Sequence, residues 1–176
     1  ILFPGSKKYW EKRYAKGENS GAGSYGELAV FKAQVINKFV EDNSIKSVME
    51  FGCGDGNQLK LAKYYEYIGF DISQTAVNIC KKNFPNDESK RFLLLTEYDG
   101  CKADLVLSLD VLYHLVEETI FEEHLNTLFN ASSKFVIIFA INNDDDRYNA
   151  AHIKVRKFTS WIEANKPDWK LIQFIP

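Results

Sequence analysis

The stretch GCGDG at residues 52–56 constrains the fold of this chain more than any other part of its sequence. Three glycines at alternate positions let the backbone adopt positive φ angles and approach a ligand more closely than a Cβ would allow. The run before them, residues 47–51, is short, bounded by glycine and apolar except for Glu50, which is typical of a buried strand. The sequence therefore predicts a strand that ends in a ligand-binding turn.

A helix is expected after the turn, over residues 57–65, with its free N–H groups and positive dipole end pointing at the same ligand. The next apolar run, residues 67–70, predicts a second strand that ends at Asp71. A carboxylate 15 residues after Gly56 is placed to accept hydrogen bonds from a ribose diol. Alone, the turn could be a plain strand-to-helix connection and Asp71 a helix cap, but together they favour a nucleoside ligand.

The spacing of the glycines separates two classes of cofactor. A dinucleotide-binding turn needs a third glycine at the position that Asn57 occupies. The sequence from Glu50 to Gly56 instead reads acid-x-Gly-x-Gly-x-Gly, and it resembles the first motif of the class I S-adenosylmethionine (SAM)-dependent methyltransferases. In that family the loop holds the methionine part of SAM. The resemblance implies a cofactor site formed by Glu50, Gly52, Cys53, Gly54, Gly56, Asp71, Ile72, Tyr98 and Asp110.

A second polar group follows the strand expected at residues 103–109. The carboxyl edge of a parallel sheet is where open α/β folds bind ligands, and the stretch LSLDVLYHL ends there. This stretch resembles the fourth-strand motif of the same family. The resemblance implies that Asp110 helps to shape the methionine pocket and that Tyr113 and His114 face the acceptor substrate.

Two loops are expected to border the cofactor. Residues 17–26 are rich in glycine and serine, as in a mobile loop. They form either a linker between helices or a flap that closes over the cofactor, in which case Tyr25 would contact its carboxylate end. The resemblance implies that the loop after the third strand flanks the adenine. There Tyr98 is a candidate to stack on the ring, and Glu97 or Asp99 to accept from its amino group.

The other segments alternate between strand and helix patterns, which predicts a doubly wound, mostly parallel α/β sheet. Helices are expected over residues 6–16, 27–42, 73–84 and 117–130, with a last one opened by a capping box at residues 160–163. Further strands are expected over residues 91–96, 134–141 and 169–175. We expect N-terminal helices and the flap at residues 1–46, and one compact SAM-binding domain at residues 47–176.

Three details of this arrangement can be tested by the structure. The apolar stripe of the second helix is predicted to face the sheet, and the strand at residues 134–141 to be fully buried. The stripe consists of Leu28, Phe31, Val35 and Phe39. The resemblance implies an antiparallel seventh strand, yet no residues remain for it after the sixth. We therefore expect either a chain cut before its natural end or one unpaired position in the sheet.

Composition excludes several classes of function. The 176 residues are 45% hydrophobic, which suits one domain with one core. A net charge of −2 supplies no positive field for nucleic acid. Three scattered cysteines without a CxxC pair indicate reduced thiols in the cytoplasm rather than zinc or disulfides. The longest apolar run, residues 135–141, is too short to cross a bilayer.

Histidine is the residue type to look for if the methyl acceptor is an oxygen. Methyl transfer from a sulfonium depends mainly on proximity and orientation, but an oxygen acceptor must also lose a proton, and histidine accepts protons near neutral pH. His114 is the best placed candidate and His152 the second, although His114 is equally compatible with a structural role at a helix start. His124 is interpreted as a packing or surface residue rather than a ligand. Arg156 is a candidate to pair with an anionic acceptor group, or else a surface residue.

The main hypothesis is a SAM-dependent methyltransferase that acts on a small-molecule acceptor, with oxygen methylation, for example of a sugar, favoured over nitrogen. A nicotinamide-dependent oxidoreductase is disfavoured by Asn57 and by the lack of a Tyr-x-x-x-Lys pair after the fourth strand. A non-catalytic SAM-binding module that works with a partner protein is the other alternative. No Asn-Pro-Pro-Tyr-like motif follows the fourth strand, which disfavours amino-group methylation of adenine, cytosine or glutamine. The oligomeric state is left open.

Overall fold

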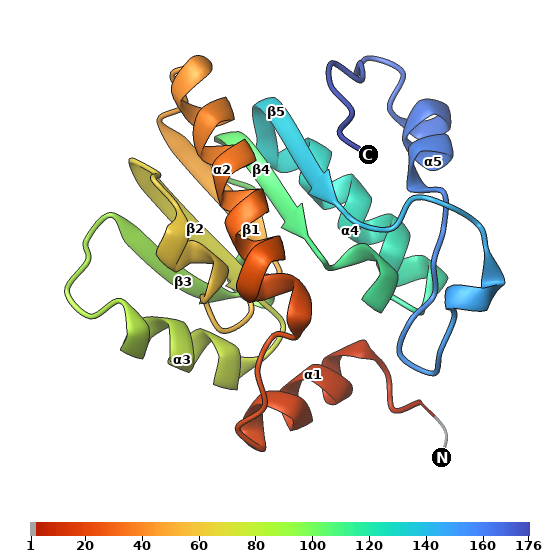
Figure 1. Cartoon of the computed structure of the whole chain (residues 1–176), viewed down its shortest axis with the longest axis horizontal. Coiled ribbons are helices and arrows are strands. Elements are labelled where there is room, and N and C mark those ends of the chain that lie inside the picture. Colours follow the sequence, from red (N-terminus) through yellow and green to blue (C-terminus); the bar gives the residue numbers. More distant parts are fainter. Residues whose placement is uncertain (1–2) are drawn as a thin grey trace.

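A computed structural model of the chain describes residues 3–176, so residues 1 and 2 of the expected N-terminal region lie outside it (Figure 1). Five parallel strands form one sheet in the order β3-β2-β1-β4-β5. They are β1 (Ser47–Phe51), β2 (Glu66–Asp71), β3 (Lys90–Leu94), β4 (Ala103–Leu109) and β5 (Ser132–Phe139). The helices are α1 (Ser6–Ala15), α2 (Gly26–Asp42), α3 (Gln74–Asn83), α4 (Glu118–Ala131) and α5 (Phe158–Asn165). The predicted doubly wound parallel fold is confirmed.

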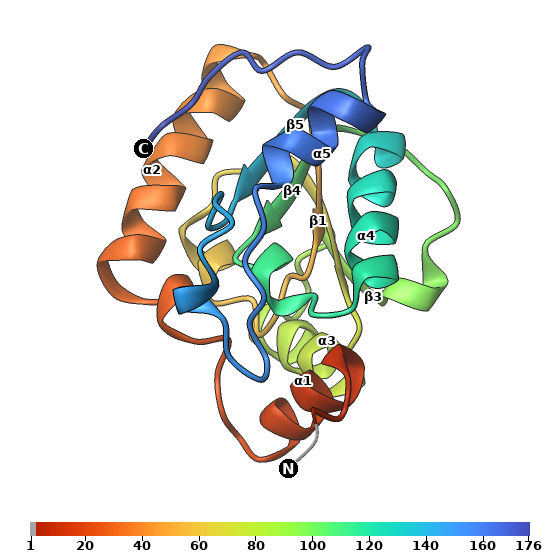
Figure 2. The ribbon, with the colours of Figure 1, turned by 90° about the vertical axis from the view of Figure 1, so that its right-hand side faces the viewer.

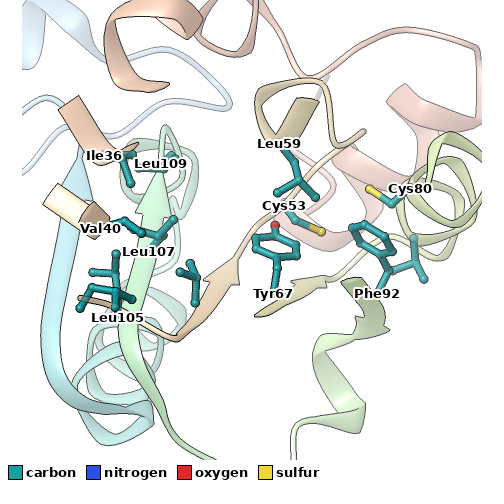
Figure 3. Close-up of a cluster of buried hydrophobic side chains, with 13 residues drawn as sticks. Ile36, Val40, Cys53, Leu59, Tyr67, Cys80, Phe92, Leu105, Leu107 and Leu109 are labelled. Atoms are coloured by element: carbon teal, nitrogen blue, oxygen red, sulfur yellow. The ribbon is translucent and has the colours of Figure 1, made fainter. Parts of the chain in front are cut away.

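Helices cover both faces of the sheet (Figures 1 and 2). On one face, α2 and α3 pack on strand residues such as Val48, Leu105 and Leu107, and Figure 3 shows this cluster. On the other face, α4 and α5 pack on the alternate residues, such as Met49 and Val106. This alternation is the period of two that a buried strand requires. The strand order reverses between β1 and β4, so the carboxyl ends of these two strands border the crevice where such sheets bind ligands.

Helix α1 crosses the carboxyl edge of the sheet (Figures 1 and 2). At its start, the Ser6 hydroxyl donates to a carboxylate oxygen of Glu117 over 2.7 Å, immediately before α4. Further along, the Glu11 carboxylate accepts hydrogen bonds from the hydroxyls of Ser73 (2.7 Å) and Thr75 (2.5 Å) at the start of α3. The helix is therefore held by the two elements that flank the crevice.

The helix predicted over residues 57–65 is wrong. Only a short 3₁₀ turn, η2 (Gln58–Leu61), follows the glycine turn, and the chain then extends into β2. Nine residues separate Gly56 from β2, and they must return the chain along the length of β1. A five-residue strand spans about 16 Å, whereas a nine-residue helix spans only about 13 Å. Part of the connection must therefore be extended, and a full helix does not fit.

The face of α2 that packs on the sheet was also predicted wrongly. Leu28 and Phe31 are 48% and 40% exposed, and of the predicted stripe only Phe39 packs on the core, edge-on against Phe135. The buried stripe is instead Ala29, Lys32, Ala33, Ile36 and Val40. Both stripes recur at helical spacing, so periodicity alone does not select between them. The alanines let the helix approach the sheet closely, which the bulkier stripe would prevent.

The C-terminal part departs most from expectation. β5 is an edge strand bonded only to β4, so Phe135 to Phe139 are only partly buried rather than fully buried. The predicted sixth strand is wrong, because residues 169–175 have no strand pairing, and Leu171 is 75% exposed. The predicted capping box is wrong too, since α5 begins at Phe158 and places Ser160 inside its first turn. Within the described residues the sheet has five strands and no seventh.

Candidate active site

The glycine turn after β1 has the predicted conformation. Gly52, Gly54 and Gly56 have φ angles of 93°, 57° and 73°, a region that disfavours residues with a Cβ. The main-chain N–H groups of Gly52 and Cys53 both donate to the carbonyl oxygen of Phe70, over 2.7 and 3.1 Å. These bonds fasten the turn to the end of β2 and so set the turn beside the residue that follows.

Asp71 lies directly under this turn. One carboxylate oxygen accepts from the N–H of Gly54 and the other from the N–H of Ser73, each over 2.9 Å. Burial raises the pKa of Asp71 to about 6, and these main-chain N–H groups oppose the rise. Each oxygen has two lone pairs, so both retain capacity for a second donor. The predicted juxtaposition of the glycine turn and this carboxylate is present.

Glu50 lies beneath the turn, inside the sheet. It is buried, and it accepts a hydrogen bond of 2.6 Å from the Tyr67 hydroxyl on β2. Burial raises the pKa of Glu50 to about 7, while the hydroxyl of Tyr67 and the charge of Lys32 act in the opposite direction. The acid of the first motif is thus a buried, hydrogen-bonded group.

The flap of residues 17–26 lies on the glycine turn and includes a short 3₁₀ turn, η1 (Ala22–Ser24). Asp55 anchors it, because the main-chain N–H of Ser20 (2.9 Å) and the hydroxyl of Tyr25 (2.8 Å) both donate to its carboxylate. In return, the N–H of Asp55 donates to the Ser20 hydroxyl over 2.9 Å. A Cβ on Gly54 would collide with that same hydroxyl and lie 2.9 Å from the hydroxyl of Tyr14. The turn is therefore closely covered.

Asp110 ends β4 on the other side of the crevice. Its φ angle is 60°, and its main-chain N–H donates to the carbonyl of Phe139 over 2.8 Å. One carboxylate oxygen accepts from the Tyr113 hydroxyl over 2.9 Å, and the other forms an ion pair with Lys32 from α2. Sequence reasoning missed Lys32. The available signal was a lysine at helical spacing from Ala29, Ala33 and Ile36.

His114 is held in one orientation by aromatic rings and by a carbonyl group. Its Nδ1 lies 3.1 Å from the carbonyl oxygen of His152. A carbonyl can only accept, so Nδ1 carries the proton and Nε2 presents a lone pair. Trp10 and Tyr113 pack against the ring with centroid distances of 4.8 and 4.5 Å. Burial lowers the pKa of His114 to about 4, so the ring is neutral at physiological pH.

The comparisons with known proteins agree with this geometry. A family model described as a methyltransferase domain matches residues 26–174. The chain belongs to the class I SAM-dependent methyltransferases. None of the curated proteins matches the sequence significantly.

Solved methyltransferase structures share the fold at low sequence identity. The DhpI-SAM-HEP complex is 14% identical with a TM-score of 0.63, and the match covers 91% of this chain and 85% of that one. The N-methyltransferase NodS from Bradyrhizobium japonicum WM9, in complex with S-adenosyl-L-homocysteine, is 15% identical with a TM-score of 0.60 over 73% and 68%. CalS10, an amino pentose methyltransferase from Micromonospora echinaspora bound to SAM, is 14% identical with a TM-score of 0.53 over 62% and 49%. The chain spans about half the length of CalS10.

The residues of this chain fit SAM in two respects. The glycine turn presents main chain without a Cβ, covered at Gly54 by the Ser20 hydroxyl of the flap, and Asp71 keeps lone pairs for a ribose. The predicted residues that meet at this edge of the sheet are Glu50, Gly52, Cys53, Gly54, Gly56, Asp71, Ile72, Asp110, Tyr113, His114 and His152. Their contacts with SAM remain predictions.

The loop predicted to flank the adenine bonds largely to itself. The ring of Tyr98 packs edge-on against Phe51 and Phe70, at centroid distances of 5.2 and 5.5 Å, and its hydroxyl donates to the carbonyl of Cys101. Glu97 accepts from the main-chain N–H of residue 94, and Asp99 from that of Cys101. Tyr98 thus lies at the ends of β1 and β2, whereas the two acids stabilise the loop.

Arg156 lies at the start of α4. Its guanidinium donates to the carbonyls of Leu115 (2.9 Å) and Val116 (3.0 Å), pairs with Glu118 at 3.1 Å and lies 4.4 Å from the ring centroid of Phe121. These contacts occupy much of its donor capacity. The geometry therefore gives Arg156 a structural task, and its predicted role toward an acceptor stays a prediction.

Three further findings concern the rest of the described chain. His124 is half-buried and its Nε2 lies 2.9 Å from the Ser108 hydroxyl, which agrees with a packing role rather than a ligand role. Residues 3–176 contain no group of three or more His, Cys, Asp or Glu side chains that could hold a metal ion. No helix within that range has the length and apolar character needed to cross a membrane.

Proposed function

We propose that this domain transfers the methyl group of SAM to an oxygen atom of a small molecule, such as a sugar hydroxyl. The observation that carries the proposal is the position of His114 at the end of β4, with its lone pair on Nε2 and with Asp110 and Tyr113 beside it. SAM, when bound, supplies a methyl group on a sulfonium. The protein's own part is to hold the cofactor and acceptor in line and to accept a proton.

The two ends of the crevice suit the two ends of SAM. Asp71 would accept hydrogen bonds from the ribose hydroxyls, and the turn of residues 52–56 would hold the methionine part against its main chain. The flap, anchored by Ser20 and Tyr25 on Asp55, would have to lift for the cofactor to enter and would then shield it from water.

His114 suits the removal of a proton from a hydroxyl. An alcohol oxygen becomes strongly acidic as it gains a methyl group, so a weakly basic imidazole is able to accept its proton at that stage. The bond from Nδ1 to the carbonyl of His152 fixes the tautomer and leaves Nε2 as the accepting atom. A neutral amine acceptor would not need such a group in the transfer step, because its lone pair is already nucleophilic.

A small acceptor is supported by the charge of the chain and by one relative. The net charge of −2 supplies no attraction for a polynucleotide. CalS10, which shares the fold, is an amino pentose methyltransferase. The rings of Tyr9 and Trp10 on α1 contact those of His152 and His114, so α1 closes the acceptor side of the crevice and limits its size.

The test combines cofactor binding with methyl transfer. Calorimetry should show SAM binding by the wild type and weaker binding by Asp71→Ala. Labelled SAM and a panel of sugars, phenols and amines should then identify an oxygen acceptor. On that acceptor, His114→Gln should lower kcat by about 10² to 10⁴ while SAM affinity stays the same. Failure of the wild type to bind SAM would refute the proposal. Binding without turnover on any acceptor would favour a non-catalytic SAM-binding module.

A further inference from the structure

Lys32 is a buried lysine on the inner face of α2. Its side chain is only 2% exposed, and lysine is almost never buried to this degree without a partner. Its partner is the carboxylate of Asp110, and its ammonium lies 4.9 Å from the ring centroid of Phe139. An ammonium has three donors. Among the described residues, only Asp110 accepts a hydrogen bond from it.

The surroundings of Lys32 explain why a cation is tolerated there. Asp110 pairs with it directly, and Glu50 is close enough for the lysine charge to lower its pKa against the effect of burial. Tyr113 donates its hydroxyl to the same Asp110 carboxylate, and Tyr67 donates to Glu50. The ammonium is therefore neutralised, yet two of its N–H donors have no acceptor among residues 3–176. A buried donor without an acceptor is costly, which indicates a site prepared for an anionic ligand group.

The order of the strands says which part of SAM would reach Lys32. β1 lies between β2 and β4, so the glycine turn lies between Asp71 and Asp110. Val111, next to Asp110, packs against Gly52, and a Cβ on that glycine would collide with it. A cofactor whose ribose is held by Asp71 and whose chain crosses the glycine turn must end beside Asp110. The end of SAM that lies there carries a carboxylate and an ammonium, and of these two groups only the carboxylate can accept hydrogen bonds from a lysine.

We propose that Lys32 is the cation that binds the methionine carboxylate of SAM. Asp110 holds the ammonium of Lys32 in place for this contact. This inference rests on the proposed function and assigns a cofactor-binding role to a residue on α2. The ion pair orients the lysine in advance, so its two remaining N–H groups meet the carboxylate without a rearrangement of the helix.

The test measures binding rather than turnover, with three ligands that differ at the amino-acid end. They are SAM, decarboxylated SAM, which lacks only the carboxylate, and 5′-methylthioadenosine, which lacks the whole end. Calorimetry on the full chain should show wild type binding SAM about 10- to 100-fold more tightly than decarboxylated SAM, as expected for a hydrogen-bonded ion pair. In Lys32→Met this ratio should fall to near one, while the affinity for 5′-methylthioadenosine is unchanged.

Lys38 supplies the matched control. It lies on the same helix, is exposed and pairs with Asp42, so Lys38→Met should keep the wild-type ratio. Lys32→Met leaves Asp110 without its cation, so the double variant Lys32→Met with Asp110→Asn removes both charges and should fold. Its ratio of SAM affinity to decarboxylated-SAM affinity should also fall to near one.

Three outcomes decide the matter. The inference would be overturned if both Lys32 variants kept the wild-type ratio of SAM affinity to decarboxylated-SAM affinity. It would also be overturned if they lost affinity equally for all three ligands, because that result would mean a purely structural lysine. Absence of any nucleoside binding by the wild type would refute the proposed function on which the inference rests. Loss of the carboxylate contribution alone in the Lys32 variants would establish that Lys32 binds the carboxylate.

Discussion

The two halves of the carboxyl edge are built in different ways. The β1–β2 half consists of residues close in sequence, and its bonds run mostly to the main chain, as between Asp71 and the N–H of Gly54. The β4 half consists of side chains from distant segments. Lys32 reaches Asp110 across 78 positions of the sequence, and His114 contacts a carbonyl 38 positions away. The first half is a local motif, whereas the second exists only once the chain has folded.

The halves also differ in charge. Burial raises the pKa of both Glu50 and Asp71 in the first half, whereas it lowers the pKa of His114 in the second. The first half therefore gains stability at low pH and the second half loses it. This contrast gives the largest of the effects that we expect.

Glu50→Gln should change how stability depends on pH. With a folded pKa of about 7, Glu50 binds more protons when folded than when unfolded, where its pKa is about 4.3. Its contribution is therefore complete below pH 4 and is lost as the pH rises through 7. In urea unfolding, the free energy of unfolding of the variant, relative to that of the wild type, should rise by about 3 kcal/mol between pH 4 and pH 8, at 1.36 kcal/mol per pKa unit. His114 and His124 are common to both proteins, so their opposite contributions cancel.

Glu122 on α4 is the control for this experiment, because its side chain is exposed. Glu122→Gln should give a stability curve parallel to that of the wild type. Parallel curves for Glu50→Gln as well would mean that Glu50 is not a buried acid of raised pKa.

Arg156→Met tests how much a long-range side-chain contact stabilises the β4 half. The loss of two carbonyl bonds and of the contact with Phe121 should lower the free energy of unfolding by about 2 kcal/mol, as for hydrogen bonds from a charged group. Arg147→Met is the control, because that arginine is exposed and, among residues 3–176, pairs only with Asp145. If Arg156→Met kept wild-type stability but lost turnover on the acceptor, the substrate-facing role predicted from the sequence would replace the structural one.

The same difference decides what could be predicted from the sequence. The strands Ser47–Phe51 and Ala103–Leu109 were predicted with their observed bounds, and so was the meeting of the glycine turn with Asp71. These features depend on local composition and on a spacing of a few residues. The inward face of α2 depends on which stripe fits the sheet, and both of its stripes have helical periodicity. The tail at residues 169–175 has the composition of a strand, but a strand also needs a partner.

The candidate site shows the same limit. Asp110 and His114 could be found because they follow a strand directly. Lys32 shares a helical stripe with Ala29 and Ile36, which indicates at most that it lies on a buried face, because nothing near it in the sequence shows that α2 brings it to the end of β4. Likewise, the tautomer of His114 depends on the carbonyl of His152, which belongs to a loop beyond β5. Long-range contacts of this kind require the folded structure.

The smallest expected effect separates backbone strain from close packing in the first half. Gly54 and Gly26 have φ angles of 57° and 58°, but only a Cβ on Gly54 would meet other atoms, those of Ser20 and Tyr14. An alanine in this conformation costs about 1 kcal/mol, so Gly54→Ala and Gly26→Ala should lose similar stability in urea unfolding from that cause. Gly54→Ala should in addition weaken SAM binding about tenfold, which corresponds to about 1.4 kcal/mol, because the methyl group occupies the cradle. Equal SAM affinity in the two variants would mean that the bare main chain at Gly54 serves the flap alone.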